Sequence, residues 1–105
     1  MPVTSRPAAY LVSAEIPQLA LGEAATIGRM DYHSLVLADP RVSRDHASIR
    51  WDEARGSYMV EDVSSGERGW GVVVNGMLLA KRDPRPLADG DEITIVDHLF
   101  RFVTD

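Results

Sequence analysis

Apolar residues alternate with polar ones at a period of two in several short runs of this sequence. In residues 46–52 every second position is apolar, namely Ala47, Ile49 and Trp51. Successive side chains of a β-strand point to opposite faces, so this pattern indicates strands with one buried face. The same period recurs in residues 57–62, 92–95 and 98–103, and shorter strands are expected at 9–12, 26–28, 35–37 and 72–74.

Turn-forming residue pairs separate these runs at short intervals. They are Asp39-Pro40, Arg55-Gly56, Ser65-Gly66, Asn75-Gly76, Asp83-Pro84 and Asp89-Gly90. Asn75-Gly76 predicts a two-residue hairpin between 72–74 and 77–79, because Asn and Gly both accept positive φ. The best helical alternative, residues 15–25, is interrupted by Pro17 and Gly22. The pattern therefore predicts an all-β fold, a twisted antiparallel β-sandwich of two sheets.

Length and charge narrow the class of protein. The chain has 105 residues, which predicts one domain over residues 1–105. It contains no cysteine, and its formal net charge of −5 argues against nucleic-acid binding. The sequence has no apolar run of membrane-spanning length and no signal peptide, so we expect a cytoplasmic protein with no membrane partner. Arg41, Arg44 and Arg50 could form a local positive patch or a scatter of solvated side chains.

Two segments carry residues suited to binding an anion. The first is a strand that ends in Gly28-Arg29, where glycine permits an unusual backbone angle and arginine offers a planar, permanently charged fork. The second runs from a turn through Ser43 and Arg44 into the strand that follows. A serine hydroxyl and loop N–H groups can complete a cradle for phosphate oxygens.

Together these segments resemble the forkhead-associated (FHA) family. The matching motifs are Gly28-Arg29, the Ser-Arg-x-His-Ala run at 43–47, Asp62, Val-Asn-Gly at 74–76 and Leu-x-Asp-Gly-Asp at 87–91. They occur in the family's order and span essentially the whole chain. The resemblance implies a twisted sandwich of two antiparallel sheets, whose loops at one end hold a phosphothreonine in an extended peptide.

The resemblance also implies a role for individual residues. The phosphate-gripping arginine falls on Arg29 and the phosphate-binding serine on Ser43, while Arg44 is expected to reach the phosphate or the peptide backbone. His46 matches the family's structural histidine, which braces loops rather than touching the ligand. Asn75 matches the hairpin asparagine, which likewise organises a loop, and Gly28 supports the site structurally.

One loop departs from the family pattern. Aligned back from Asn75, Gly69 stands where the family has a phosphate-binding Ser or Thr, and Trp70 stands where it has a peptide-binding Asn. An indole has one donor and cannot replace the donor and acceptor of an amide. Two alternatives stay open: Trp70 packs on an apolar peptide side chain while Arg68 adds a phosphate contact, or Trp70 folds over the loop and weakens the site.

Other functions find less support in the residues. Ser43 and His46 lack a demonstrated carboxylate partner for a catalytic triad, and we predict a binding module rather than an enzyme. Histidines 33, 46 and 98 show no short metal-ligand spacing, and no glycine-rich nucleotide loop is present, so neither metal nor cofactor is expected. The expected partner is a phosphothreonine-containing protein or peptide, with a Ser/Thr kinase upstream. The alternative is a degenerate FHA domain, acting as a phosphate-independent interaction or oligomerisation module.

Overall fold

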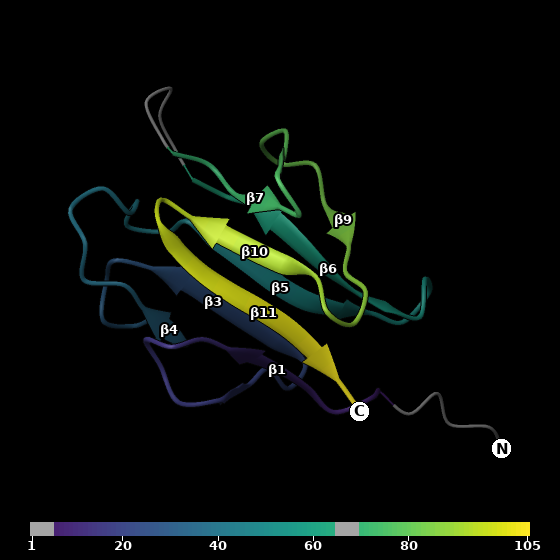
Figure 1. The fold of residues 1–105 in the computed structure, drawn as a ribbon. Helices are drawn as coiled ribbons and strands as arrows, with labels where there is room; N and C mark the ends of the chain where they lie inside the picture. Colours follow the sequence, from purple (N-terminus) through teal and green to yellow (C-terminus); the bar gives the residue numbers. More distant parts are fainter. Residues whose placement is uncertain (1–5, 65–69) are drawn as a thin grey trace, which may run out of the picture.

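The computed structural model describes residues 6–64 and 70–105, which form a sandwich of two β-sheets (Figure 1). The six-stranded sheet has the order β2-β1-β11-β10-β7-β8. Its strands are β1 (Ala9–Val12), β2 (Leu19–Ala20), β7 (Val73–Val74), β8 (Met77–Leu78), β10 (Glu92–Ile95) and β11 (His98–Thr104). The five-stranded sheet has the order β4-β3-β5-β6-β9. Its strands are β3 (Ala24–Gly28), β4 (Leu35–Val36), β5 (Ala47–Asp52), β6 (Ser57–Asp62) and β9 (Arg85–Pro86).

The predicted all-β sandwich is confirmed, with no helix in the described part of the chain. The runs with clear alternation all form strands, whereas β2 and β9 were missed because two residues are too short to show a period. Strand pairing is antiparallel except that β4 runs parallel to β3, with Ile27 opposite Leu35. No described segment is a helix long and apolar enough to cross a membrane.

The core lies between the two sheets and is built from the predicted inward faces. Ile49 and Val60 from one sheet and Ile93 and Phe100 from the other are all completely buried. Burying an aliphatic or aromatic side chain of this size contributes about 1.5–3 kcal/mol relative to leaving it exposed. These apolar layers hold the two sheets together and so fix the loops at their ends.

The predicted hairpin at Asn75-Gly76 is present, and both residues have positive φ, 51° and 82°. The Asn75 amide donates to Asp91 Oδ1 at 2.9 Å and accepts from the Glu92 backbone N–H at 2.9 Å. The asparagine therefore forms the turn and also ties it to the start of β10.

Several loops meet at one end of the sandwich because of the strand register. Ile27 pairs with Ala47, and Ala47 pairs with Asp62, so the segments following β3 and β6 and the one preceding β5 emerge together. The turn between β10 and β11 lies at this same end, on the left of Figure 1, and the C-terminus lies at the other end. We call this the loop end.

Candidate functional site

Backbone hydrogen bonds place the two predicted anion-binding segments side by side. The Arg29 N–H donates to the Ser43 carbonyl at 3.0 Å, and the His46 N–H donates to the Ile27 carbonyl at 2.9 Å. Residues 29 and 43 are far apart in sequence but neighbours at the loop end. The structure thus brings Arg29, Ser43 and Arg44 together.

The Arg29 side chain is exposed and only partly engaged. Its Nε donates to the Val42 carbonyl at 3.0 Å, which holds the guanidinium against the Ser43 loop. Among the described residues, no carboxylate forms an ion pair with it. The two terminal nitrogens of Arg29 therefore remain available to an incoming anion.

Arg44 is exposed as well, and its guanidinium has no hydrogen-bond or ion-pair partner in residues 6–64 and 70–105. Ser43, between it and the Arg29 contact, is half-buried. Two arginines without carboxylate partners beside a serine hydroxyl make a positive site on an acidic protein. This arrangement suits a doubly charged oxyanion.

His46 braces the loops from beneath and is completely buried. Its Nδ1 lies 3.0 Å from the Ser43 backbone N–H, which can only donate, so Nδ1 is the acceptor. Its Nε2 lies 2.7 Å from the Gly71 carbonyl and must donate. The two contacts define a neutral imidazole with its proton on Nε2, which joins the Ser43 loop to the segment after Trp70. The predicted structural role of His46 matches this position.

Gly28 is required by close packing rather than by backbone angle. A Cβ there would lie 2.2 Å from the Arg44 carbonyl oxygen and 2.4 Å from His33 Nε2. These two atoms are themselves joined by a hydrogen bond of 2.6 Å. A side chain at position 28 would therefore push apart the loops that carry Arg29 and Arg44.

An aromatic pair flanks the arginines on the loop after β3. The rings of Tyr32 and His33 lie 4.4 Å apart, and His33 is almost entirely covered while Tyr32 is exposed. The Tyr32 hydroxyl donates to Asp45, and this hydrogen bond raises the pKa of the tyrosine. Asp45 also lies 3.0 Å from His33 Nε2. The pair fixes the orientation of the β3–β4 loop next to Arg44.

Trp70 lies at the loop end with 55% of its surface exposed. The guanidinium carbon of Arg41 lies 5.9 Å from the centre of its ring, within the range of a cation–π contact. Two other predicted site residues, Arg68 and Gly69, fall outside the described residues. The structure thus keeps Trp70 accessible instead of burying it in the core.

Arg41 is held by carboxylates and does not join Arg29 and Arg44 in a positive patch. It contacts both oxygens of Asp39, at 3.0 and 2.8 Å, and Asp97 Oδ1 at 3.1 Å. Hydrogen bonds from Arg41 hold the pKa of Asp39 well below its usual range, and Asp39 raises the pKa of Arg41 in return. Arg50, the third arginine of the expected patch, lies on β5 and faces Glu61 at 3.8 Å. A patch of all three arginines is therefore not formed.

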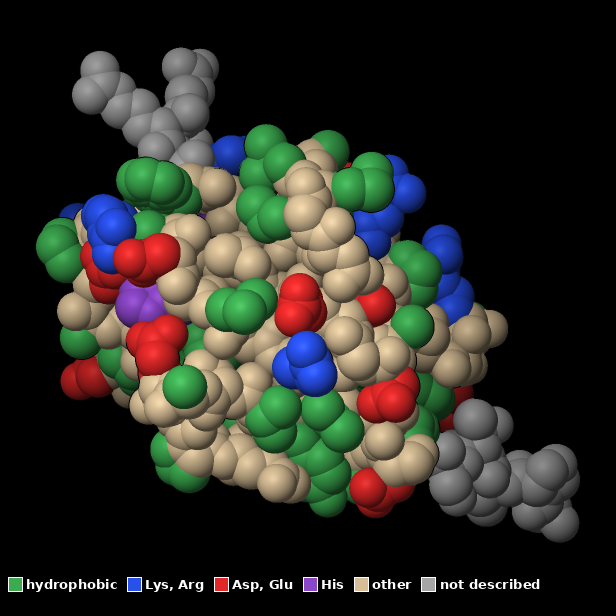
Figure 2. Space-filling model, in the orientation of Figure 1, with side chains coloured by type: hydrophobic (Ala, Val, Ile, Leu, Met, Phe, Trp, Pro, Cys, Tyr) green, Lys and Arg blue, Asp and Glu red, His purple; other side chains and the backbone are tan. Residues whose placement is uncertain are grey.

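His98 extends this ionic network. Its Nδ1 lies 2.7 Å from Glu15 Oε1 and its Nε2 lies 2.8 Å from Asp39 Oδ2. Burial opposes the charged form of His98, but the hydrogen bonds to Asp39 and Glu15 outweigh it and raise the pKa. Figure 2 shows these acidic, basic and histidine side chains gathered on the left, at the loop end.

One group in the described residues has the spacing to hold a metal ion. Donor atoms of Asp39, Asp97 and His98 lie within 4.8 Å of one another. The Arg41 guanidinium contacts both of these carboxylates and supplies the positive charge between them. The spacing of histidines in the sequence could not reveal this group, because only one of its members is a histidine.

The comparisons with known proteins agree with this geometry. Residues 25–96 match the FHA domain family, a span that includes Arg29, Ser43 and Trp70. This chain belongs to the FHA domain family. No curated protein sequence matches the chain.

Solved FHA structures share the fold. Mycobacterium tuberculosis EmbR, in complex with a low-affinity phosphopeptide, is 33% identical with a TM-score of 0.77, over 92% of this chain and 24% of EmbR. The N-terminal FHA domain of S. cerevisiae Rad53p, in complex with a phosphothreonine peptide, is 22% identical with a TM-score of 0.79, over 93% of this chain and 94% of that one. The MEK1 FHA domain, in complex with the HOP1 pThr318 peptide, is 25% identical with a TM-score of 0.75, over 94% of this chain and 98% of that one. The chain thus spans about a quarter of EmbR.

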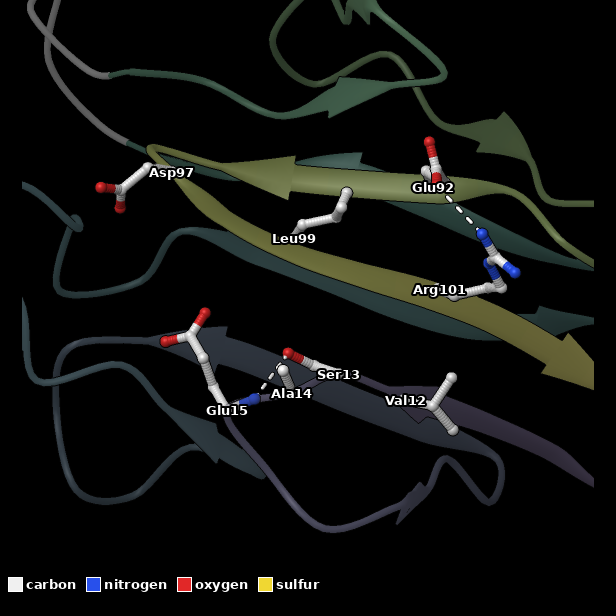
Figure 3. Close-up of a pocket in the computed structure, with 8 residues that line it drawn as sticks. All are labelled: Val12, Ser13, Ala14, Glu15, Glu92, Asp97, Leu99 and Arg101. Carbon is white, nitrogen blue, oxygen red and sulfur yellow. Dashed lines mark hydrogen bonds and ion pairs between the residues drawn. The ribbon is translucent and has the colours of Figure 1, made fainter.

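Two features of this FHA domain lie apart from Arg29 and Arg44. Asn75 contacts Asp91 and Glu92 at the start of β10, whereas Asp97, which contacts Arg41, follows the end of that strand. The outer face of the six-stranded sheet carries a shallow hollow of about 520 Å³ (Figure 3). Leu99 lies at its centre, Glu15 and Asp97 at one end, and the Glu92–Arg101 pair at the other. None of the predicted site residues within 6–64 and 70–105 lines this hollow.

Proposed function

We propose that this FHA domain, taken as one unit over residues 1–105, binds phosphothreonine peptides through Arg29 and Ser43. The observation that carries the proposal is the pair of arginines, Arg29 and Arg44, without carboxylate partners among the described residues, beside the Ser43 hydroxyl. Solved relatives that hold phosphothreonine peptides support the choice of ligand.

A phosphothreonine brings about −1.5 to −2 charges and three acceptor oxygens near neutral pH. In the proposed complex the free nitrogens of Arg29 donate to two oxygens, and the Ser43 hydroxyl donates to another. Arg44 contacts the phosphate or the peptide main chain. His46 does not touch the ligand, because both of its ring nitrogens are already engaged.

The rest of the assignment follows from this binding role. Trp70 contacts the peptide on the side facing Arg41. Arg68 and Gly69 are assigned to the peptide site from the sequence alone. The domain acts as a binding module without catalysis, placed downstream of a Ser/Thr kinase in the cytoplasm. Neither nucleic acid nor membrane takes part.

The test is a titration of a degenerate phosphothreonine peptide library against the protein and its Arg29→Ala variant. Phosphoserine and unphosphorylated libraries serve as ligand controls, and Arg50→Ala, an exposed arginine on β5, serves as the protein control. Removing one partner of such a charge pair costs about 2–5 kcal/mol, so Arg29→Ala should weaken binding by tens-fold or more. Binding that is indifferent to phosphate and to Arg29 would contradict the proposal.

A second candidate is a phosphate-independent interaction module centred on Trp70. Its support is the accessible indole, 55% exposed, next to an arginine whose charge two carboxylates already balance. Such a module would bind equally well without phosphate and would lose affinity in Trp70→Ala but not in Arg29→Ala. The same titration therefore separates the two functions.

A further inference from the structure

The two sheets leave a mainly apolar groove between their edge strands, on one side of the sandwich. β8 is the edge of the six-stranded sheet and β9 is the edge of the five-stranded sheet. Between them lies a groove of about 360 Å³, which we call the β8–β9 groove. Its lining is mainly apolar, with Val74, Met77, Leu79 and Pro86. It also includes Arg85 and the Asp91 carboxylate, which already accepts hydrogen bonds from the Asn75 amide and the Ala88 N–H.

Unusually exposed apolar side chains border this groove. Met77 is 73% exposed and Leu78 is 67% exposed, more than Trp70 at the loop end. Both belong to β8, a position where a sheet edge would commonly carry charged residues to prevent association. Leaving two large apolar side chains in water at an edge is typical of a surface that a partner covers.

The backbone of β8 is also available for pairing. Among the described strands β8 pairs with β7 alone, with Val74 opposite Met77 and Val73 opposite Leu78. Hydrogen-bonded and non-hydrogen-bonded pairs alternate in an antiparallel ladder, and the residues next to a two-residue turn form the hydrogen-bonded pair. The N–H and C=O of Leu78 therefore point away from β7, toward the free edge.

The groove is bordered by positive charge, although the whole chain carries −5. Lys81 and Arg82 lie on the segment that joins β8 to β9, and Arg85 is the first residue of β9. The Lys81 ammonium donates to the Ser64 hydroxyl at 3.0 Å. Asp83 pairs with Arg85 at 2.8 Å, while the exposed Arg82 side chain forms no ion pair with a described residue. Figure 2 shows basic and hydrophobic side chains together at the upper right, over this region.

We propose that the β8–β9 groove is a second binding site, for an extended segment of a partner protein that carries both acidic and apolar side chains. The segment pairs with Leu78 as an added strand, places an apolar side chain against Met77 and Pro86, and sets a carboxylate near Arg82, which pairs with no described carboxylate. A second copy of this chain is a poor occupant. β8 is two residues long, and its exposed apolar surface is that of Met77 and Leu78. This surface is far smaller than the about 800 Å² per partner that a stable dimer typically buries. This site does not depend on phosphate or on Arg29.

The experiment uses the whole protein and a synthetic peptide in which Asp or Glu alternates with Val or Leu. A peptide with Lys in place of every acidic residue is the ligand control. Amide chemical shifts and calorimetric titration are recorded for the wild type, Leu78→Asp and the double variant Arg82→Glu/Arg85→Glu. Leu99→Asp, an exposed leucine on β11, is the matched control.

We expect the acidic peptide to shift amides in residues 77–86, and each of the two test variants to bind it at least about ten-fold more weakly, while Leu99→Asp binds normally. Arg29→Ala should bind this peptide like the wild type, so failure here is distinct from failure of phosphothreonine binding. No shifts in 77–86 at millimolar peptide would overturn the proposal. So would equal binding of the Lys peptide, or self-association that Leu78→Asp abolishes.

Discussion

The Arg41 guanidinium lies 5.9 Å from the centre of the Trp70 ring, and two carboxylates fix it there. Asp39 holds it through both oxygens and Asp97 holds it from the β10–β11 turn. Arg41 lies only two residues before Ser43, yet its charge is already balanced. It therefore supports the indole, whereas Arg29 and Arg44 keep their charge for a ligand.

Arg41→Met should release Trp70 from this support without unfolding the domain, because Arg41 is exposed. With Trp51→Phe as background, Trp70 is the only tryptophan. We expect the tryptophan emission to shift and acrylamide to quench it more strongly. Arg44→Met in the same background is the control and should leave the emission unchanged. Identical quenching in all three proteins would show that Arg41 does not position the ring.

Replacing His46 with Ala should destabilise the fold strongly. The substitution leaves the Ser43 N–H and the Gly71 carbonyl without their buried partner, at about 1–3 kcal/mol for each unsatisfied group. Urea denaturation should give a loss of roughly 2–5 kcal/mol in the free energy of unfolding. A loss below about 0.5 kcal/mol is the range of ordinary surface substitutions, and it would show that His46 does not hold the two segments together.

Gly28→Ala should also destabilise the protein, by about 1–3 kcal/mol, because the added Cβ overlaps the Arg44 carbonyl and His33. The hydrogen bond between those two groups has to lengthen, which should broaden or shift the His33 ring resonances in NMR spectra. Ala24→Ser, at the exposed first position of β3, is the control. Unchanged His33 resonances in Gly28→Ala would contradict the packing argument.

We expect the free energy of unfolding to fall at higher pH because of His98. Its pKa in the folded protein is raised above the unfolded value, about 6.5, by Asp39 and Glu15, with Asp97 and Arg41 also nearby. A raised pKa stabilises the fold fully below about pH 6.5, and this stabilisation disappears as the pH rises through the folded pKa.

The measurement compares the free energy of unfolding of the wild type with that of His98→Gln between about pH 6 and pH 9. The advantage of the wild type should shrink as the pH rises. An NMR titration of the His98 ring should give a pKa that falls when Glu15 is changed to Gln. A constant difference across this range would exclude the imidazolium as a source of stability.

The strands could be predicted from sequence because their signals are local. Alternation placed β5, β6, β10 and β11, and Asn75-Gly76 placed a hairpin whose φ angles are positive as expected. The Arg29 and Ser43 segments meet because β3 and β5 pair in register, a pairing that the residues alone do not specify.

The ionic network around Arg41 could not be predicted in the same way. Arg41 and Asp97 are 56 residues apart, and Glu15 and His98 are 83 apart. Each looks like an ordinary solvated side chain in sequence, and only the packing of the loop end brings them together. For the same reason the sequence allowed Arg41 to join Arg44 and Arg50 in a positive patch. In the structure, Asp39 and Asp97 balance the charge of Arg41 instead.

The double contact of His46 has a consequence for how a ligand is held. One imidazole fixes the Ser43 loop and the Gly71 segment at once, so neither can move away from the other without breaking a buried hydrogen bond. Conformational entropy of these backbone segments is therefore lost during folding and not during complex formation. In the proposed complex the phosphopeptide meets a preorganised surface, so its binding free energy does not have to offset the ordering of these segments. Changes in specificity can then accumulate at side chains outside the frame, as at Trp70, while the frame itself stays intact.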